Sequence, residues 1–87
     1  MRVVGRFYGF GADEMCSNKR TKDIVRARQV AMFLMKHKTS KSLREIAASL
    51  DRKDHTTVTH AVEKIKELQN TDASYFDDIR SIERLLM

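Results

Sequence analysis

Residues 51–65 read Asp-Arg-Lys-Asp-His-Thr-Thr-Val-Thr-His-Ala-Val-Glu-Lys-Ile, and this stretch decides the fold. Asp54 suits a helix N-cap, because its carboxylate can accept hydrogen bonds from the backbone N–H groups of Thr56 or Thr57. From there apolar residues recur at helical spacing, at Val58, Ala61, Val62, Ile65 and Leu68. The stretch therefore predicts an amphipathic helix over residues 55–69.

The opposite face of this helix carries mainly short polar side chains, namely those of Thr56, Thr59, His60 and Glu63. Threonine and histidine are poor helix formers, so helix stability does not explain their concentration in the first turns. Hydroxyls, an imidazole and the free N–H groups of a helix start suit base edges and phosphate oxygens. We therefore interpret residues 55–69 as a DNA recognition helix.

A shorter helix is predicted just upstream of this one. Ser42-Leu-Arg-Glu45 has the form of a capping box. The buried face of the short helix is given by Leu43, Ile46, Ala47 and Leu50. Residues 51–54 then interrupt the apolar pattern. A short helix, a four-residue turn and a longer helix with a polar leading face are typical of a helix-turn-helix.

The remaining segments are also predicted to be helical, since the 87 residues contain no Pro and only three Gly. We expect these additional helices over residues 2–9, 12–15, 21–37 and from about residue 72 onward. The predicted fold class is all-α. It comprises a linker helix and connector in residues 1–17 and one small helix-turn-helix domain in residues 18–87.

Positive charge is concentrated in one part of the chain. The formal net charge is +5, and residues 19–53 hold eleven Lys and Arg against three Asp and Glu. With a pI near 9.7, this distribution indicates an acidic partner that docks on one face. The basic segment leads directly into the predicted recognition helix, and the charge alone is compatible with either nucleic acid or anionic lipid.

Several motifs follow one another along the chain: Ser17-Asn-Lys-Arg-Thr21, Arg26-Ala-Arg-Gln-Val-Ala-Met32 and Asp54-His-Thr-Thr-Val58, with His60-Ala61 and Lys64-Ile65. In this order they resemble the C-terminal DNA-binding domain of DnaA, the bacterial initiator of chromosome replication. Residues 1–17 resemble the linker helix that precedes that domain. The resemblance implies a Trp-repressor-like, DnaA-type fold that binds double-stranded DNA. The implied targets are DnaA boxes, short A·T-biased sites used to initiate and regulate chromosomal replication.

The resemblance also implies roles for individual residues. Asp54, His55 and Thr56 would read base edges in the major groove. Arg20 would enter the minor groove, where a guanidinium suits A·T-rich sequence. Contacts to the DNA backbone or to adjacent bases would come from Arg28, Gln29, Lys36, Ser42, Leu43, Arg44, Lys53, Thr57 and His60.

The chain departs from the family in the turn between the two helices. DnaA proteins usually carry Gly-Gly-Arg there, and this chain has Asp51-Arg52-Lys53. If the turn needs a positive φ, the loss of Gly is costly for most residues. Asp51 is the candidate for that position, because Asp tolerates the left-handed region better than most. Lys53 keeps the charge of the family's Arg without its bidentate reach, so site preference can differ.

No motif in the sequence predicts an enzyme, a cofactor or a metal site. A Gly-rich phosphate loop is absent, and His55 and His60 lie about 140° apart round a helix, too far for one metal. The single cysteine, Cys16, is interpreted as a small, partly buried residue. Because no signal peptide or transmembrane run is present, we expect a cytoplasmic protein.

Two alternatives to DNA binding remain open. The helix-turn-helix surface could dock a replication regulator. Basic residues 2–10 could instead bind acidic phospholipids, although a helix of two turns is short for firm membrane binding. We favour a first helix that packs on the domain or continues a longer helix. Removing the first ten residues would separate the lipid hypothesis from the DNA hypothesis, because lipid binding should be lost and DNA binding largely retained. A monomer is the expected state.

Overall fold

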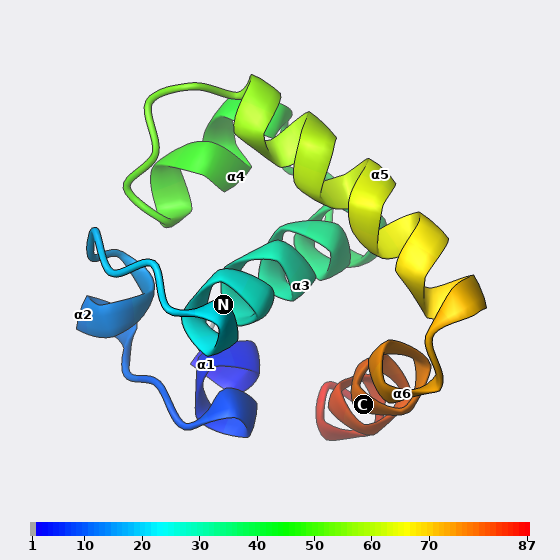
Figure 1. Ribbon diagram of the computed structural model, residues 1–87. Helices are drawn as coiled ribbons and strands as arrows, with labels where there is room; N and C mark the ends of the chain where they lie inside the picture. The colour runs from blue at the N-terminus through cyan, green and yellow to red at the C-terminus, as the bar shows by residue number, and fades with distance from the viewer. Residues whose placement is uncertain (1) are drawn as a thin grey trace.

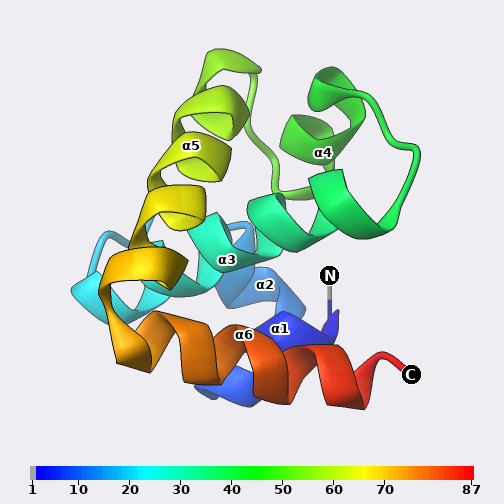
Figure 2. The ribbon, with the colours of Figure 1, turned by 90° about the vertical axis from the view of Figure 1, so that its right-hand side faces the viewer.

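The computed structural model describes residues 2–87 and contains six helices and no strand in that range. The helices are α1 (Arg2–Tyr8), α2 (Ala12–Met15), α3 (Lys22–Lys38), α4 (Leu43–Ser49), α5 (Thr56–Thr71) and α6 (Ala73–Leu85). α3 runs through the middle, with α4 and α5 on one side and α1 and α6 on the other (Figure 1, Figure 2). The predicted all-α class is confirmed. Met1 lies outside the described residues, so the predicted segment 1–17 is described from Arg2 onward.

α3 is the central element because its apolar residues cover most of its circumference. Its residues 30–35 are six consecutive buried positions, which a helix achieves only when it is covered on several sides. The buried side chains that pack around it come from the other five helices and from Leu50, the residue after α4: Val4, Met15, Ile46, Ala47, Leu50, Val58, Ala61, Ile65, Ile79 and Ile82. The core therefore holds the helix-turn-helix of α4 and α5 rigidly on α3.

α1 belongs to this core. Val4 is fully buried, and the Tyr8 hydroxyl donates to Asp78 Oδ2 of α6 at 2.9 Å. A Cβ on Gly5 would lie 2.7 Å from the Phe10 carbonyl oxygen, so the chain can fold back here only with glycine. The interpretation of the first helix as one packed on the domain is confirmed. Removing ten residues would open the core, so that truncation does not isolate lipid binding.

α5 is longer at its C-terminal end than the predicted helix 55–69. The side chains of Asn70 and Thr71 donate to carbonyl oxygens one turn back in the same helix, and both residues extend it. Asp72 ends it and caps α6, because its Oδ1 accepts from the Ser74 backbone N–H at 2.9 Å. α5 therefore ends two residues later than predicted, whereas the last helix begins after Asp72, as predicted.

Candidate nucleic-acid interface

The start of α5 carries the polar face predicted from the sequence. Asp54 Oδ1 accepts from the Thr56 backbone N–H at 2.9 Å, so the predicted hydrogen bond is confirmed, although α5 begins one residue later than predicted and His55 takes the N-cap position. This hydrogen bond lowers the pKa of the Asp54 carboxyl, so the group is ionised at neutral pH. His55 is half-buried just before the first turn. The exposed side chains beyond it are those of Thr56, Thr57, Thr59 and His60.

α4 is capped at its N-terminus as predicted. Ser42 Oγ accepts from the Glu45 backbone N–H at 3.1 Å, and Glu45 Oε1 accepts from the Ser42 backbone N–H at 3.0 Å. These hydrogen bonds lower the pKa of the Glu45 carboxyl. The capping box is thus confirmed, and it orients the first turn of α4, where the backbone N–H of Leu43 is one of the free helix-start donors.

The turn after α4 is a Schellman motif. The backbone N–H of Arg52 donates to the Ala47 carbonyl at 2.8 Å, and that of Asp51 donates to the Ala48 carbonyl at 3.0 Å. Asp51 has a φ of 56° and is the one residue other than Gly with a positive φ in residues 2–87. The prediction that Asp51 would take this conformation is confirmed. The turn therefore closes without the family's glycine.

Arg28 differs from its predicted place on the polar side of its helix. Its side chain is only 6% exposed. The guanidinium donates to the carbonyl oxygens of Met15, Glu14 and Ser17 at 2.7, 3.1 and 2.6 Å, and also to that of Lys19. Burial lowers its pKa, and the charge of Arg52 lowers it further. Arg28 thus holds the end of α2 and residues 16–21 against α3. We call residues 16–21 the connector from here on.

The residues predicted to contact DNA lie near both ends of α3. Arg20 is exposed on the connector, and it shares a hollow of about 260 Å³ with Arg28, Arg52 and Thr57. Lys36 lies at the opposite end of α3, and Lys36, Ser42, Arg44 and Lys53 are all exposed. Gln29 and Leu43 are half-buried. The structure thus brings Arg20 and Thr57 together and leaves Lys36 apart from them.

Sequence reasoning missed Arg52 as a residue of this surface. Arg52 Nη2 donates to the Ser17 carbonyl at 2.8 Å, across 35 positions of the chain. No sequence pattern predicts this contact, because the partner is a backbone group that only the fold brings near.

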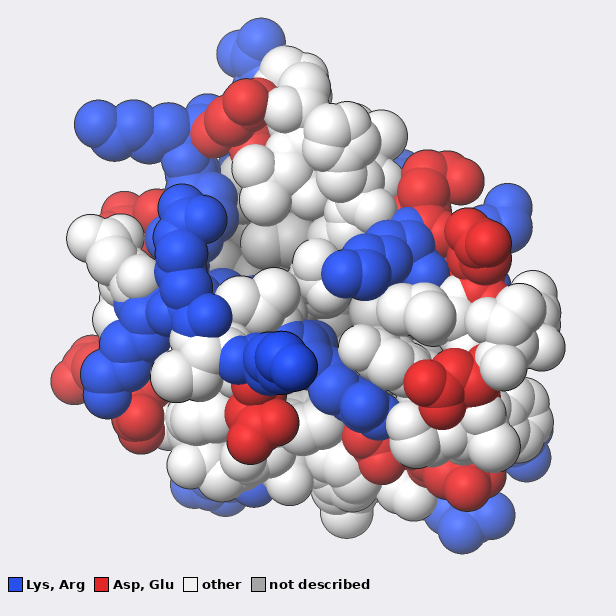
Figure 3. Space-filling view, viewed as in Figure 1, with Lys and Arg blue, Asp and Glu red and all other residues white. Residues whose placement is uncertain are grey.

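Most Lys and Arg side chains of the connector and of the helix-turn-helix turn have no acidic partner. The ion pairs within residues 2–87 are Lys19–Glu14, Arg26–Asp78 and Lys38–Glu83. None of them involves Arg20, Arg44, Arg52 or Lys53. Figure 3 shows Lys and Arg gathered at the left and across the centre of the view, beside the largely uncharged start of α5. A surface with unpaired cations beside neutral hydrogen-bonding groups matches the two needs of DNA recognition, backbone attraction and base reading.

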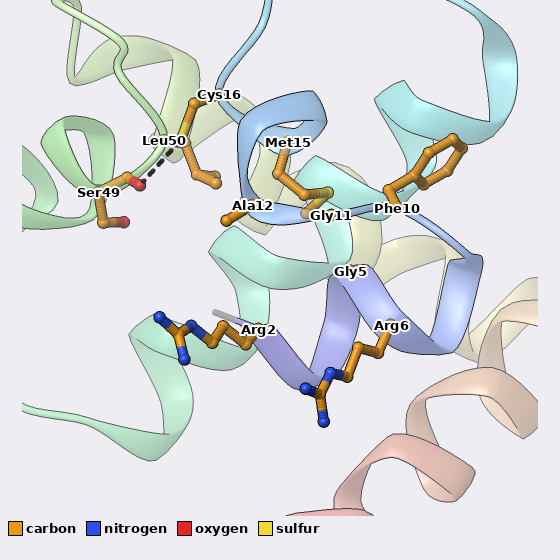
Figure 4. Close-up of a pocket in the computed structure, with 10 residues that line it drawn as sticks. All are labelled: Arg2, Gly5, Arg6, Phe10, Gly11, Ala12, Met15, Cys16, Ser49 and Leu50. Atoms are coloured by element: carbon orange, nitrogen blue, oxygen red, sulfur yellow. Dashed lines mark hydrogen bonds between the residues drawn. The ribbon is translucent and has the colours of Figure 1, made fainter.

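A cavity of about 310 Å³ lies between α1, α2 and the end of α4, with no lining residue from α5. Cys16, which is half-buried as predicted, points at the Ser49 carbonyl at 3.6 Å, and Arg2 and Arg6 point away from α2 (Figure 4). The lining contains no carboxylate and no histidine. Within the described range, no three His, Cys, Asp or Glu side chains are grouped as a metal site needs. No helix of residues 2–87 is long and apolar enough to span a membrane.

Comparison with known proteins identifies the family. The family described as "Bacterial dnaA protein helix-turn-helix" matches residues 1–65. Proteins named "Chromosomal replication initiator protein DnaA" are similar over 85 residues, 98% of this chain. The protein from Rhodopseudomonas palustris is 46% identical, that from Mesorhizobium japonicum 44% and that from Brucella abortus 42%. The matched part is 17–18% of those proteins, so the chain spans less than a fifth of their length. The chain therefore belongs to the bacterial DnaA helix-turn-helix family.

Proposed function

We propose that this chain is a sequence-specific duplex DNA-binding module that reads DnaA-box-type sites in the initiation and regulation of chromosomal replication. The observation that carries the proposal is the start of α5. There a capped, core-anchored helix exposes Thr56, Thr57, Thr59 and His60 beside cations that have no carboxylate partner.

In this proposal α5 enters the major groove with its first turn against base edges. The Thr56 methyl would pack on thymine methyl groups, and the free Asp54 oxygen would accept from a cytosine amino group. His55 would contribute a ring nitrogen. Arg20, exposed on the connector, would reach the minor groove of A·T-rich sequence.

The DNA backbone would be held from both sides of this helix. Leu43 would donate its backbone N–H at the start of α4, as helix N-termini do to phosphates. The other contacts would come from Gln29, Lys36, Ser42, Arg44, Lys53, Thr57 and His60, of which all but Gln29 are exposed. Arg28 would act mainly through the connector, because most of its N–H groups already donate to carbonyls.

The role is one of binding and not of catalysis, and it belongs to a single chain on one short site. A chromosomal role places it in the cytoplasm. A replication regulator that docks on the same helix-turn-helix surface would compete with DNA for α5.

Acidic phospholipid is a second candidate partner, favoured by Arg2, Arg6 and Phe7, which are exposed on α1. Replacing Arg2 and Arg6 with Gln removes both charges and leaves Val4 in the core. Loss of binding to phosphatidylglycerol vesicles with DNA binding unchanged would support this role. Equal vesicle binding by the variant would exclude it.

Selection from a random duplex library tests the main proposal. The wild-type chain should enrich one short A·T-biased site within a few rounds. The variant with Thr56→Ala should enrich a relaxed site, because one base contact is lost, whereas Lys36→Ala should enrich the same site more weakly. A wild-type selection that enriches no common site would refute sequence-specific binding.

A further inference from the structure

The carbonyl oxygen of Ser17 accepts hydrogen bonds from two guanidinium groups that come from different parts of the fold. Arg28 Nη2 of α3 donates to it at 2.6 Å, and Arg52 Nη2 of the helix-turn-helix turn donates to it at 2.8 Å. Ser17 lies three positions before Arg20. One backbone oxygen therefore joins the base of the connector to both α3 and the turn that precedes α5.

Arg52 is a rigid anchor on the turn side. Its backbone N–H closes the Schellman motif on Ala47, and the preceding Asp51 is fixed in the left-handed region. Its side chain is half-buried, whereas its neighbours Asp51 and Lys53 are exposed. The position of the guanidinium thus follows the position of the turn.

The connector has few other restraints. Asn18, Lys19 and Arg20 are exposed, and the backbone N–H of Lys19 reaches only Ser17 Oγ, at 3.3 Å. Besides the contacts of Arg28 and Arg52, this segment has the exposed Lys19–Glu14 ion pair at 3.6 Å and the weak Cys16–Ser49 contact at 3.6 Å. An exposed segment with so few backbone hydrogen bonds is ordered mainly by the side chains that donate hydrogen bonds to it.

The hydrogen bonds from Arg28 and Arg52 to the connector bring several positive charges close together. Arg20, Arg28 and Arg52 line one hollow without a carboxylate among its lining residues. Burial lowers the pKa of the Arg28 guanidinium, and the charges of Arg52 and Arg20 lower it further. The carbonyl oxygens of the connector offset part of this repulsion, and a nearby DNA phosphate would offset more.

We propose that Arg52 is a positioning residue for the minor-groove contact, a latch between the helix-turn-helix turn and the connector that carries Arg20. The inference rests on the proposed DNA binding and adds to it a coupling between two reading elements. With the latch closed, α5 and Arg20 would dock as one unit, and the connector would not need to be ordered at the moment of binding. Pre-ordering a segment in its bound form is a general source of affinity and specificity.

A double-mutant cycle on DNA tests the coupling. Arg52→Ala should weaken binding to the selected duplex by about tenfold in the wild-type chain and less than about twofold in a chain that already carries Arg20→Ala. Arg52→Lys, which keeps the charge and a long-reaching donor, should restore most of the loss. Arg84→Ala removes one charge from the exposed face of α6 and serves as the control. An equal loss from Arg52→Ala in both backgrounds would mean an independent phosphate contact and would overturn the latch.

The free protein provides a second measurement. Backbone ¹⁵N relaxation should show lower order parameters for Asn18, Lys19 and Arg20 in Arg52→Ala, with α5 unchanged. Unchanged order parameters would overturn the latch alone, because this measurement uses no DNA. Lower order parameters in a protein that prefers no duplex would instead contradict the proposed function and, with it, the positioning role.

Discussion

At the residue scale, Asp51 shows how this chain closes its turn without glycine. It occupies the position after a helix C-cap where a left-handed conformation is required, with φ at 56°. Aspartate tolerates this region because its short polar side chain can bond locally, yet a Cβ still crowds the backbone there.

Asp51→Gly should therefore stabilise the fold, raising the free energy of unfolding by about 0.5–1 kcal/mol through relief of that crowding. Urea denaturation followed by circular dichroism measures the change. Asp51→Ala, which has a Cβ and no polar group, should shift the midpoint in the opposite direction. A lower midpoint for the glycine variant would mean that the carboxylate makes a stabilising contact that outweighs the strain.

Arg28 is the residue whose environment the sequence did not reveal. Its predicted position on a polar helix face follows from periodicity, but four carbonyl groups of residues 14–19 meet it there. Arg28→Met keeps the apolar stem and removes the donors, so the free energy of unfolding should fall by about 2 kcal/mol or more. Lys36→Met on the same helix, at an exposed site, should change it little. Equal stability of the two variants in urea would contradict the structural role of Arg28.

Thr56 and Lys36 separate base reading from backbone attraction. Thr56→Ala should cost about 1–3 kcal/mol on the preferred duplex and little on random duplex. Lys36→Ala should weaken both and reduce the slope of log K against log salt by roughly one unit. Fluorescence anisotropy on both duplexes measures these effects. Equal losses from Thr56→Ala on the two duplexes would remove Thr56 from the base-reading set.

At the element scale, the features predicted correctly are those with local signals. The capping box at Ser42, the cap at Asp54 and the apolar stripe of α5 depend on residues within one or two turns of each other. The contacts that the sequence did not predict join distant segments, as Arg52 does with Ser17. α5 extends two residues beyond the predicted end at Gln69 because Asn70 and Thr71 bond back into the helix, an option that composition alone does not reveal.

The caps give stability a defined pH dependence, and Asp72 is the clearest case because it lies away from the proposed interface. Hydrogen bonds from Ser74 lower the pKa of its carboxyl in the folded state. Stability from a lowered carboxyl pKa is present above the unfolded value, about 3.9, and is lost as pH falls through the folded value.

Asp72→Asn keeps a capping oxygen that does not titrate. Between pH 7 and about 3, the melting temperature of the wild-type chain should therefore fall further than that of the variant. Thermal melts followed by circular dichroism across this range measure both curves. Parallel curves would show that the Asp72 cap does not depend on its charge.

At the scale of the whole molecule, one core presents the α4–α5 pair and the connector on a common face. α1 is part of that core through Val4, so the predicted division between residues 1–17 and 18–87 does not correspond to a gap in packing. That residues 1–17 and 18–87 are separate parts of the chain stays a prediction. Charge asymmetry was readable from the sequence, but the grouping of the cations was not. Arg20, Arg28 and Arg52 line one hollow, whereas Lys36 lies near the opposite end of α3.

The central claim is that this surface reads sequence and does not merely attract phosphate. Fluorescence anisotropy on a duplex with one DnaA box and on its scrambled version, across a salt series, tests it most directly. We predict binding to the box duplex about 10³-fold tighter at physiological salt. Equal affinities that weaken together as salt rises would contradict the claim, because they would leave only electrostatic attraction.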